Sequence, residues 1–551
     1  MKLRLPKILA DEDELDFAPN HLEAEEAEPR PHPHPWAWTA SIAAVAAMPR
    51  ILYLFVFSDP QNPGDGVYTD VWHHWQIAYL TKEIGLSASG GPRLWDLKGL
   101  DYFWGVLHPA LMVIVFDVTG SIDIVLDRLV SIAFGAAAAV FLFHICRYHW
   151  GTAPALAASL VASLLPTSVM NDASGMLEPL GIALCLAGVW AWTVRQGLAG
   201  GVALGLASMA RAEAWIFGIG LVIAALLRRS PSRHRGPLII GFAVVLGLYM
   251  ALLLNETGNP IYPLWWNFLA NALGKWEVAV TAYQSGVRPA LGAILLIAVV
   301  GLGWALVKRP PSYMLLTFGF GYWVFVAGLI GFTSYLADWS WWTPIGRHFE
   351  FPYVFAGTLL AVALLWWTPR RFGPRTVPFA WAAIGSGILA TQLLWIPIAN
   401  AFGPTEMTWQ ATLADGRALA SSYHQSPYAG HAIALPPDRP DMTYALARFG
   451  GVEGRHLVSE MYDPFAYLPP GYRIEDHPTT ASTLIQCWLS ASDIRIIAIP
   501  DTDPHLALVR DLNPTWFGKL GYLQEAGWDV EAVTIPTPGP GECAAAKSAV
   551  R

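Results

Sequence analysis

The sequence predicts a mainly α-helical membrane protein: a polytopic transmembrane bundle of about eleven spans with a large first extracytoplasmic loop, followed by a C-terminal extracytoplasmic α/β domain. Hydrophobic residues make up 54% of the chain and charged residues only 14%, which is too apolar for a soluble protein of this length. Apolar runs that meet or approach the roughly 20 residues needed to cross a bilayer recur along the chain. The 26 Trp and 19 Tyr suit the two interfaces of a membrane with water.

Residues 1–35 differ sharply from the rest of the chain. They begin with lysines and arginines, then become acidic and proline-rich, and they lack an apolar stretch followed by a small-residue cleavage site. Such a composition cannot bury a core, so we expect a disordered acidic cytoplasmic tail and not a signal peptide.

The apolar runs and the basic loops together predict the topology. We expect spans at Trp36–Phe57, Ile122–Cys146, Thr152–Pro166, Gly175–Val194, Gly197–Met209, Ala214–Leu227, Pro237–Leu254, Ala290–Val307, Tyr313–Leu336, Phe351–Trp367 and Phe379–Ile398. Lysine and arginine are retained in short cytoplasmic loops. With the N-terminus inside, every second loop is basic and contains no Asp or Glu. These inner loops carry Arg147; Arg195; Arg228, Arg229, Arg233 and Arg235; Lys308 and Arg309; and Arg370, Arg371 and Arg375. The membrane domain is therefore expected over residues 36–399.

The first outer loop, residues 58–121, is too long to be a simple connector. The stretch "TDVWHHWQIAYLTKEIG" has helical periodicity and ends at a glycine, so we expect a helix along the membrane interface. The stretch "WGVLHPALMVIVFDVTG" is too short and interrupted to span, and is expected to form a second interfacial helix. Counting it as a span would invert every later loop.

Residues 400–551 are proline-rich and more polar, and they predict a small extracytoplasmic α/β domain. A β-like run occurs at Ile494–Pro500, and "FGKLGYLQEAGW" is expected to be helical. The four cysteines have no CxxC spacing, which argues against a zinc or thioredoxin-type motif. Cys487 and Cys543 can pair if this domain lies outside the cytoplasm. No basic stripe points to a nucleic-acid partner, and the net charge of -8 comes mainly from the first tail and the soluble parts.

Ionisable residues at membrane depth gather on the expected outer face. Charge near a bilayer is costly unless it is paired or lines a wet cavity, so these residues are the candidate site. They are Asp70, His73 and His74 in the first loop; Asp172 and Glu178; Arg211 and Glu213; and Arg347, His348 and Glu350. Taken singly, each has an ordinary structural explanation, such as a helix cap or a side chain that reaches the headgroups. The argument rests on the set.

The set has the parts needed for glycosyl transfer from a phosphate carrier. Asp70 can serve as the base for an incoming hydroxyl, while Arg211, Arg347 and the histidines His73, His74 and His348 can hold the departing phosphate. Alternatively, Asp70 and Glu178 can share a divalent ion, Mg²⁺ or Mn²⁺, that bridges to the phosphate. Asp172, Glu213 and Glu350 are expected to support these residues. The residues alone leave both alternatives open.

Five stretches together resemble the GT-C superfamily of polyprenyl-phosphate-dependent membrane glycosyltransferases. They are "YTDVWHHWQIAYLTKEIG", "LLPTSVMNDASGMLEPLGIAL", "LGLASMARAEAW", "GNPIYPLW" and "GRHFEFPYVFAGTLLA". The second is similar to an acidic motif of the oligosaccharyltransferase catalytic subunit. The resemblance implies that Glu178 stands where that family has a metal-binding acid, that Asp70 is the first-loop aspartate, and that Arg347 binds the carrier phosphate.

The chain also departs from that pattern. The first loop has histidines after Asp70 where a full acidic pair is expected, and no "WWDYG"-like acceptor motif occurs in the tail; "WSWW" (Trp339–Trp342) lies in a different loop. A single-sugar transferase resembling the mannosyl- or aminoarabinosyl-transferring branches is thus as well supported as transfer of an oligosaccharide.

We therefore expect an integral-membrane glycosyltransferase of a prokaryotic plasma membrane, with its N-terminus in the cytoplasm and its active site outside. Its partners would be a polyprenyl-phosphate- or diphosphate-linked sugar, membrane lipids, and a protein, lipid or glycan acceptor, with no nucleic acid. The main alternative is a multi-span transporter or a flippase for lipid-linked glycans, which usually carries its charges near the bilayer midplane. A non-catalytic envelope scaffold is a third alternative, and it would tolerate the loss of Asp70.

Overall fold

The protein's structure, a computed structural model, describes residues 35–62, 70–85, 104–227, 233–265, 284–336, 347–402, 413–435, 440–459, 473–500, 504–520, 528–534 and 537–549. The expected acidic tail, apart from Pro35, lies outside the described residues, as do "WSWW" and residues 63–69 and 86–103 of the first loop.

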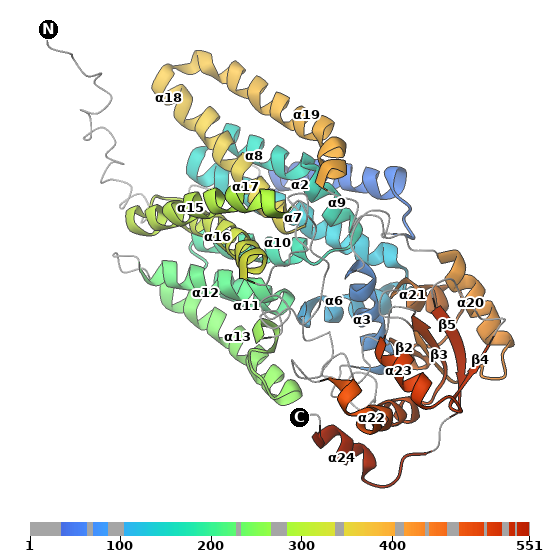
Figure 1. The fold of residues 1–551 in the computed structure, drawn as a ribbon. Coiled ribbons are helices and arrows are strands. Elements are labelled where there is room, and N and C mark those ends of the chain that lie inside the picture. Colours follow the sequence, from blue (N-terminus) through green and yellow to red (C-terminus); the bar gives the residue numbers. More distant parts are fainter. Residues whose placement is uncertain are drawn as a thin grey trace.

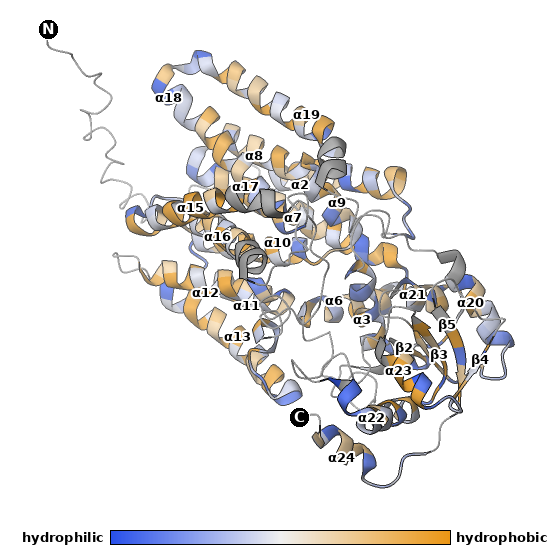
Figure 2. Cartoon of the chain, viewed as in Figure 1, coloured by the Kyte–Doolittle hydropathy of each residue, from blue (hydrophilic) through white to orange (hydrophobic). Residues whose placement is uncertain are grey.

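Apolar helices form the bundle that the hydropathy predicts (Figure 1). In chain order these are α2 (Pro35–Leu52) with η2 (Tyr53–Phe57), α7 (Ile124–Trp150), α8 (Thr152–Leu164), α9 (Pro166–Ser174), α10 (Glu178–Thr193), α11 (Gly197–Ala210), α12 (Ala212–Leu226), α13 (Arg235–Thr257), α15 (Gln284–Lys308), α16 (Tyr313–Leu336), η3 (Arg347–Phe349), α17 (Glu350–Val362) with η4 (Ala363–Trp367), α18 (Thr368–Phe372), η5 (Pro374–Thr376) and α19 (Val377–Phe402). One large cluster of buried apolar side chains joins α2, α7, α8, α10 to α13 and α15 to α17. Figure 2 shows that apolar residues are frequent along the long helices of this set.

The mainly α membrane fold is confirmed, although its helices differ in length. Among the described residues, six helices are long and apolar enough to cross a membrane, or seven if α8 and α9 count as one bent span. The expected spans at α10, α11 and α12 are present as apolar helices of 16, 14 and 15 residues. At α8 the chain does not stop at Pro166 as expected, but turns by 55° and continues as α9. This bend lies directly before the acidic motif.

The expected loop over residues 58–121 contains the two expected helices. The first is α3 (Asp70–Ile84), and the chain leaves it through Gly85, whose φ of 82° is the left-handed conformation that glycine adopts most readily. The second is α6 (Leu107–Thr119), which ends at Gly120 in the same conformation. At 13 residues, α6 is too short to span a bilayer, as predicted.

The C-terminal part is built on a five-stranded mixed sheet in the order β2-β1-β3-β5-β4. Its elements are α20 (Leu413–Gln425), β1 (Ala432–Leu435), α21 (Pro440–Arg448), η6 (Gly454–His456), β2 (Leu457–Ser459), η8 (Ile474–Asp476), α22 (Pro478–Ala491), β3 (Ile494–Pro500), α23 (Pro504–Leu512), β4 (Phe517–Lys519), β5 (Trp528–Val533) and α24 (Glu542–Ala549). Strand β1 is parallel to β2 and β3, whereas β5 is antiparallel to β3 and β4.

Two sequence-based expectations about this part have clear outcomes. The run Ile494–Pro500 is strand β3, as predicted. The expected helix over residues 517–528 was wrong at its start, because Phe517–Lys519 forms strand β4, paired with β5; residues 521–527 lie outside the described residues. Cys487 on α22 and Cys543 on α24 form a disulfide.

The α/β domain packs directly on α3, beside which it lies in Figure 1. Trp72 and Trp75 of α3 have no exposed surface, and their rings lie 5.2 Å and 4.8 Å from the ring of Tyr444. Gln76 of α3 donates a hydrogen bond of 3.0 Å to Thr443. The C-terminal domain therefore covers part of the "WHHW" helix, a contact that the sequence did not predict.

Candidate active site

Four of the predicted acidic residues begin helices. Asp70, Glu178 and Glu350 are the first residues of α3, α10 and α17, and Glu213 lies in the first turn of α12. The unpaired N–H groups and the macrodipole at a helix N-terminus stabilise a carboxylate. The fold therefore brings together several helix ends that favour negative charge.

Two arginines link these carboxylates. Arg347 forms an ion pair with Asp70 through Nη1, and its Nε lies 3.3 Å from Oε1 of Glu178. Arg211 reaches the same Glu178 oxygen at 3.0 Å through Nη1, and its Nε pairs with Glu213. Arg347, Arg211 and Glu178 are buried, whereas the Asp70 side chain is 21% exposed. Side chains from α3, α10, η3 and the link between α11 and α12 thus form one chain of ion pairs, with Asp70 at its accessible end.

A second buried network lies beside the first. Arg50, on the expected first span, donates from Nε to Asp172 at 2.5 Å and from its Nη atoms to the carbonyls of Ala46, Ala162 and Ser163. Asn171 donates to Glu350 at 3.4 Å. Two of these carbonyls lie at the end of α8, where the bend leaves backbone acceptors without helical donors. Arg50 therefore ties the bend, and with it Asp172, to α2.

Close packing of this second network requires a glycine on α7. A Cβ at Gly135 would lie 1.8 Å from Oδ2 of Asp172, a distance that no real Cβ contact shows. Only glycine lets α7 approach the Arg50–Asp172 pair this closely.

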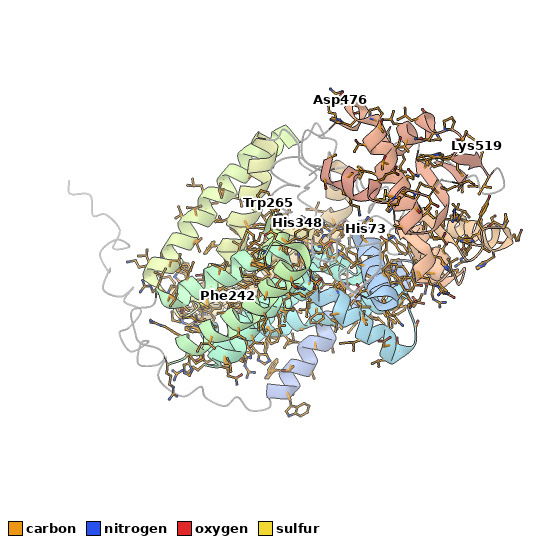
Figure 3. The ribbon with its side chains drawn as sticks, turned by 90° about the horizontal axis from the view of Figure 1, so that it is seen from below. His73, Phe242, Trp265, His348, Asp476 and Lys519 are labelled. Atoms are coloured by element: carbon orange, nitrogen blue, oxygen red, sulfur yellow. A yellow bond between two sulfur atoms is a disulfide. The ribbon has the colours of Figure 1, made fainter. Side chains whose placement is uncertain are left out.

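The three predicted histidines lie near the ion-pair chain. Figure 3 shows His73 and His348 near the middle of the molecule, between the bundle and the C-terminal domain. Arg347 donates from Nε to Nε2 of His348 at 3.4 Å, and His73 is hydrogen-bonded to Gln76 at 3.3 Å. Burial lowers the pKa of His73, and lowers that of His74 well below its usual value. Both rings are therefore neutral near pH 7, so their nitrogens act as hydrogen-bonding groups without charge.

A pocket adjoins the arginine end of the chain. Glu178, Arg211 and Glu213 form its polar side, and apolar and aromatic residues of α10, α12 and α16 form the rest. Among these, the rings of Phe217 and Tyr322 stack at 4.6 Å. The pocket is thus charged on one side and apolar on the other.

The expected metal site can be compared with this arrangement. Asp70 and Glu178, its proposed ligands, are bridged by the Arg347 guanidinium. Within the described ranges, no group of three or more His, Cys, Asp or Glu side chains is placed to hold a metal ion. A metal shared by these two carboxylates would require Arg347 to move and further ligands to join, so the observed arrangement does not fit one.

Some residues of these networks escaped sequence reasoning. Arg50 and Asp127 lie inside expected spans, and His108 lies in the interfacial helix; all three are buried and paired with polar partners. One sequence signal could have found them. A charged residue within an apolar span is costly, so any such residue is a candidate functional residue. Arg50 meets that criterion as the one charged residue within Trp36–Phe57.

A helical membrane bundle with a helical first outer loop, a paired acidic and basic cluster beside that loop, and an appended α/β domain defines a GT-C-like fold. No protein-family model matches the sequence, and a search of curated proteins finds no significant match. Similarity appears at the level of structure.

The crystal structure of the Archaeoglobus fulgidus oligosaccharyltransferase in the apo form is similar, with a TM-score of 0.52 and 11% identity over 88% of this chain and 73% of that chain. The archaeal oligosaccharyltransferase AglB from the same organism, in complex with an inhibitory peptide and a dolichol-phosphate, also gives 0.52, with 12% identity over 91% of this chain and 75% of that chain. At these identities the similarity shows the fold. The GT-C-like fold implied by the sequence resemblance is therefore confirmed.

Proposed function

We propose that the protein is an integral-membrane glycosyltransferase that transfers a sugar from a polyprenyl-phosphate or polyprenyl-diphosphate donor to an acceptor at the extracytoplasmic face. The observation that carries this proposal is the continuous chain Asp70–Arg347–Glu178–Arg211, which joins a partly exposed carboxylate to two buried guanidinium groups. An acid–base group and a phosphate-binding group are the two requirements of this reaction.

The ion pairs suggest how the two requirements are coupled. A guanidinium binds phosphate oxygens in a bidentate manner, as it binds carboxylates. A donor phosphate that binds Arg347 competes with Asp70 for the same N–H groups and so releases the carboxylate. Asp70 then accepts the proton of the acceptor hydroxyl, whose oxygen bonds to the anomeric carbon. The bond from that carbon to the phosphate oxygen breaks, and Arg347 and Arg211 hold the phosphate that leaves.

The pocket beside Arg211 places the proposed phosphate ligand next to an apolar surface. Phe217, Phe318 and Tyr322 form that apolar side, and the pocket has room for little more than a water molecule, so the isoprenoid chain of a lipid-linked donor would lie outside it. The similar AglB structure contains a dolichol-phosphate. Glu178 has a positioning role in this proposal, because it holds both arginines in place.

Two features support an extracytoplasmic site. The disulfide between Cys487 and Cys543 belongs to an oxidising compartment, and the domain that carries it packs on α3, where Asp70 begins the helix. The turn between α17 and α19 carries Arg370, Arg371 and Arg375. By the span count this turn lies on the membrane side opposite to Asp70, and its arginines are typical of a cytoplasmic loop.

The proposal can be tested with membranes that contain the protein. Labelled polyprenyl-phosphate and polyprenyl-diphosphate sugars are supplied with a mixture of protein, lipid and glycan acceptors, and with Mg²⁺, Mn²⁺ or EDTA. We expect transfer by the wild type and a loss of at least about 10²-fold for Asp70→Asn, which keeps the shape but removes the base. The matched control is Asp117→Asn, which changes an exposed aspartate of α6 in the same outer loop.

Each alternative gives a different result. Equal transfer by wild type and Asp70→Asn would remove Asp70 from the mechanism. A strict requirement for Mg²⁺ or Mn²⁺ would favour the metal-bridged arrangement of Asp70 and Glu178. Movement of intact labelled donor across the membrane without transfer would identify a flippase.

A further inference from the structure

A second group of polar side chains lies beside the ion-pair chain and takes no part in it. Nε2 of His108, on α6, is 2.7 Å from Oδ1 of Asp127 on α7. Their side chains are only 5% and 1% exposed. A carboxylate accepts hydrogen bonds, so Nε2 carries the proton in this contact. The contact also fixes the orientation of the His108 ring, and with it the place of Nδ1.

His74 faces this pair from α3. The rings of His74 and His108 lie 5.8 Å apart. His74 is 2% exposed, and neither of its ring nitrogens makes a hydrogen bond of normal geometry with the described residues; the backbone of Gly175 interacts with the ring only weakly. Burying such polar atoms without partners is costly, so a residue of this kind is expected to serve a ligand or a water molecule.

These two histidines line a small pocket with an aromatic wall. Trp104 contacts His74 edge-on, with ring centres 5.2 Å apart, and stacks on His73 at 6.1 Å. Unlike the histidines, Trp104 retains part of its exposed surface. Ile77, Gly105, Pro109 and Leu177 form the rest of the lining.

The pocket adjoins the proposed catalytic residues. His74 follows Asp70 by four residues on α3, so the two share one face of that helix. Leu177 immediately precedes Glu178. The start of α6 is pressed against the end of α11, because a Cβ at Gly105 would lie 2.3 Å from the carbonyl oxygen of Met209. The start of α6 therefore lies against the segment that carries Arg211.

We propose that this pocket binds one hydroxyl group of a saccharide acceptor, whose ring lies against Trp104. The inference rests on the proposed glycosyl transfer and specifies its acceptor: a hydroxyl-bearing sugar, in preference to the side-chain amide of a peptide. His74 and His108 are the specificity residues, and Asp127 positions His108.

The chemistry of the lining supports a neutral hydroxyl. Burial, with the nearby Arg347 and Arg211 acting in the same direction, lowers the pKa of His74 well below its usual value, so its neutral ring offers one donor and one acceptor. A hydroxyl both donates and accepts at a single oxygen and satisfies such a ring in little space. Asp127 lies behind His108, which disfavours an anion. An aromatic wall beside hydrogen-bonding edges matches the apolar face and hydroxyl rim of a sugar ring.

A footprinting measurement tests binding without turnover. Purified full-length protein in nanodiscs is exposed to hydroxyl radicals, which oxidise accessible tryptophan rings, and oxidation of partly exposed Trp104 is measured by mass spectrometry. A panel of methyl hexopyranosides and methyl pentosides is the probe, and an asparagine-containing tripeptide is the comparison. We expect at least one glycoside to protect Trp104 by about tenfold, and to protect it less in His74→Phe. Trp516 of the C-terminal domain, which is also partly exposed, is the internal control.

Protection by none of the glycosides, or by the peptide alone, would overturn the proposal and leave a pocket that holds only structural water. This result does not depend on activity, so it separates failure of the subsite from failure of the proposed transfer.

Kinetics then test specificity. His108→Asn and His74→Phe should raise the acceptor KM by about tenfold each, the effect of one lost hydrogen bond, and leave the donor KM within twofold. Asp127→Asn should shift the acceptor KM in the same direction. His431→Asn is the matched histidine control. Equal changes in donor and acceptor KM, or none in either, would contradict an acceptor subsite.

Discussion

Arg50 shows how a full charge is tolerated inside an apolar span. It is 1% exposed, and Asp172 and three backbone carbonyls accept its hydrogen bonds. Breaking a buried ion pair from one side leaves an uncompensated charge, which is far more costly than removing both partners.

We therefore expect Arg50→Met to destabilise the protein by about 3–5 kcal/mol. Adding Asp172→Asn should recover part of that loss, because the two changes act on one contact. Apparent Tm values of the single and double variants in nanodiscs measure this. Additive losses in the double variant would show that the pair is not the stabilising contact.

The buried histidines of α3 predict a pH dependence. Burial lowers the pKa of His73, and lowers that of His74 further. Between their folded-state values and the ordinary value of about 6.5, the unfolded chain binds more protons, so stability rises with pH up to about 6.5 and is lost as pH falls below it. His108, Arg347 and Arg211 face His74 and add to the effect.

The measurement is the apparent Tm at several pH values between about 5 and 8, for wild type and His74→Gln. The wild type should lose more stability on acidification than the variant, which has no ring to protonate. Identical pH profiles would mean that protonation of His74 does not cause the loss of stability at low pH.

At the scale of residues, sequence reasoning found charged residues near the ends of spans and missed Arg50 and Asp127 within them. Asp70, Glu178, Arg211 and Arg347 stood out as charges at membrane depth, and the structure joins them. The pairing of Asp172 with Arg50 could not be predicted from local pattern, because the two residues are 122 positions apart. The sequence also does not indicate that Arg347 lies between Asp70 and Glu178, where a metal ion was one alternative.

At the scale of elements, local signals predicted the helices and failed where pairing is long-range. Apolar runs and glycine stops are local, and they placed α3, α6 and the bundle helices. Strand β4 depends on β5, a segment later in the chain, so its residues could be taken for a helix. The bend after α8 was also missed, because Pro166 at the start of α9 can either end a span or begin a new helix.

The disulfide links α24, the last described helix, to α22 across 56 positions. Its loss should cost the α/β domain about 2–4 kcal/mol, because the unfolded chain gains freedom. We expect Cys487→Ser and Cys543→Ser to lower the apparent Tm equally, and the double variant to match either single one.

Alkylation of unfolded protein from membranes provides the control. Without reductant, only Cys146 and Cys185 should react, since both are free in the structure. Reaction of all four cysteines would place the domain in a reducing compartment and contradict the proposed orientation.

At the scale of the whole molecule, α3 connects the α/β domain to the site. Its middle is buried under Tyr444 and Thr443, and its first residue is Asp70. The domain also contacts the bundle where the Tyr444 hydroxyl donates to Gln61 at 2.6 Å, and where Arg448 lies 3.4 Å from Asp123. The position of Asp70 therefore depends on a domain more than three hundred residues away in sequence, which composition and periodicity could not indicate.

The most direct test of the account compares donor binding and sugar transfer in Asp70→Asn and Arg347→Ala, using labelled polyprenyl-phosphate sugar and protein in nanodiscs. Asp70→Asn should bind the donor at least as well as the wild type, because Arg347 is freed, yet transfer at least about 10²-fold more slowly. Arg347→Ala should lose both binding and transfer. Wild-type transfer by Asp70→Asn, or wild-type donor binding by Arg347→Ala, would contradict the assignment of the ion-pair chain as the active site.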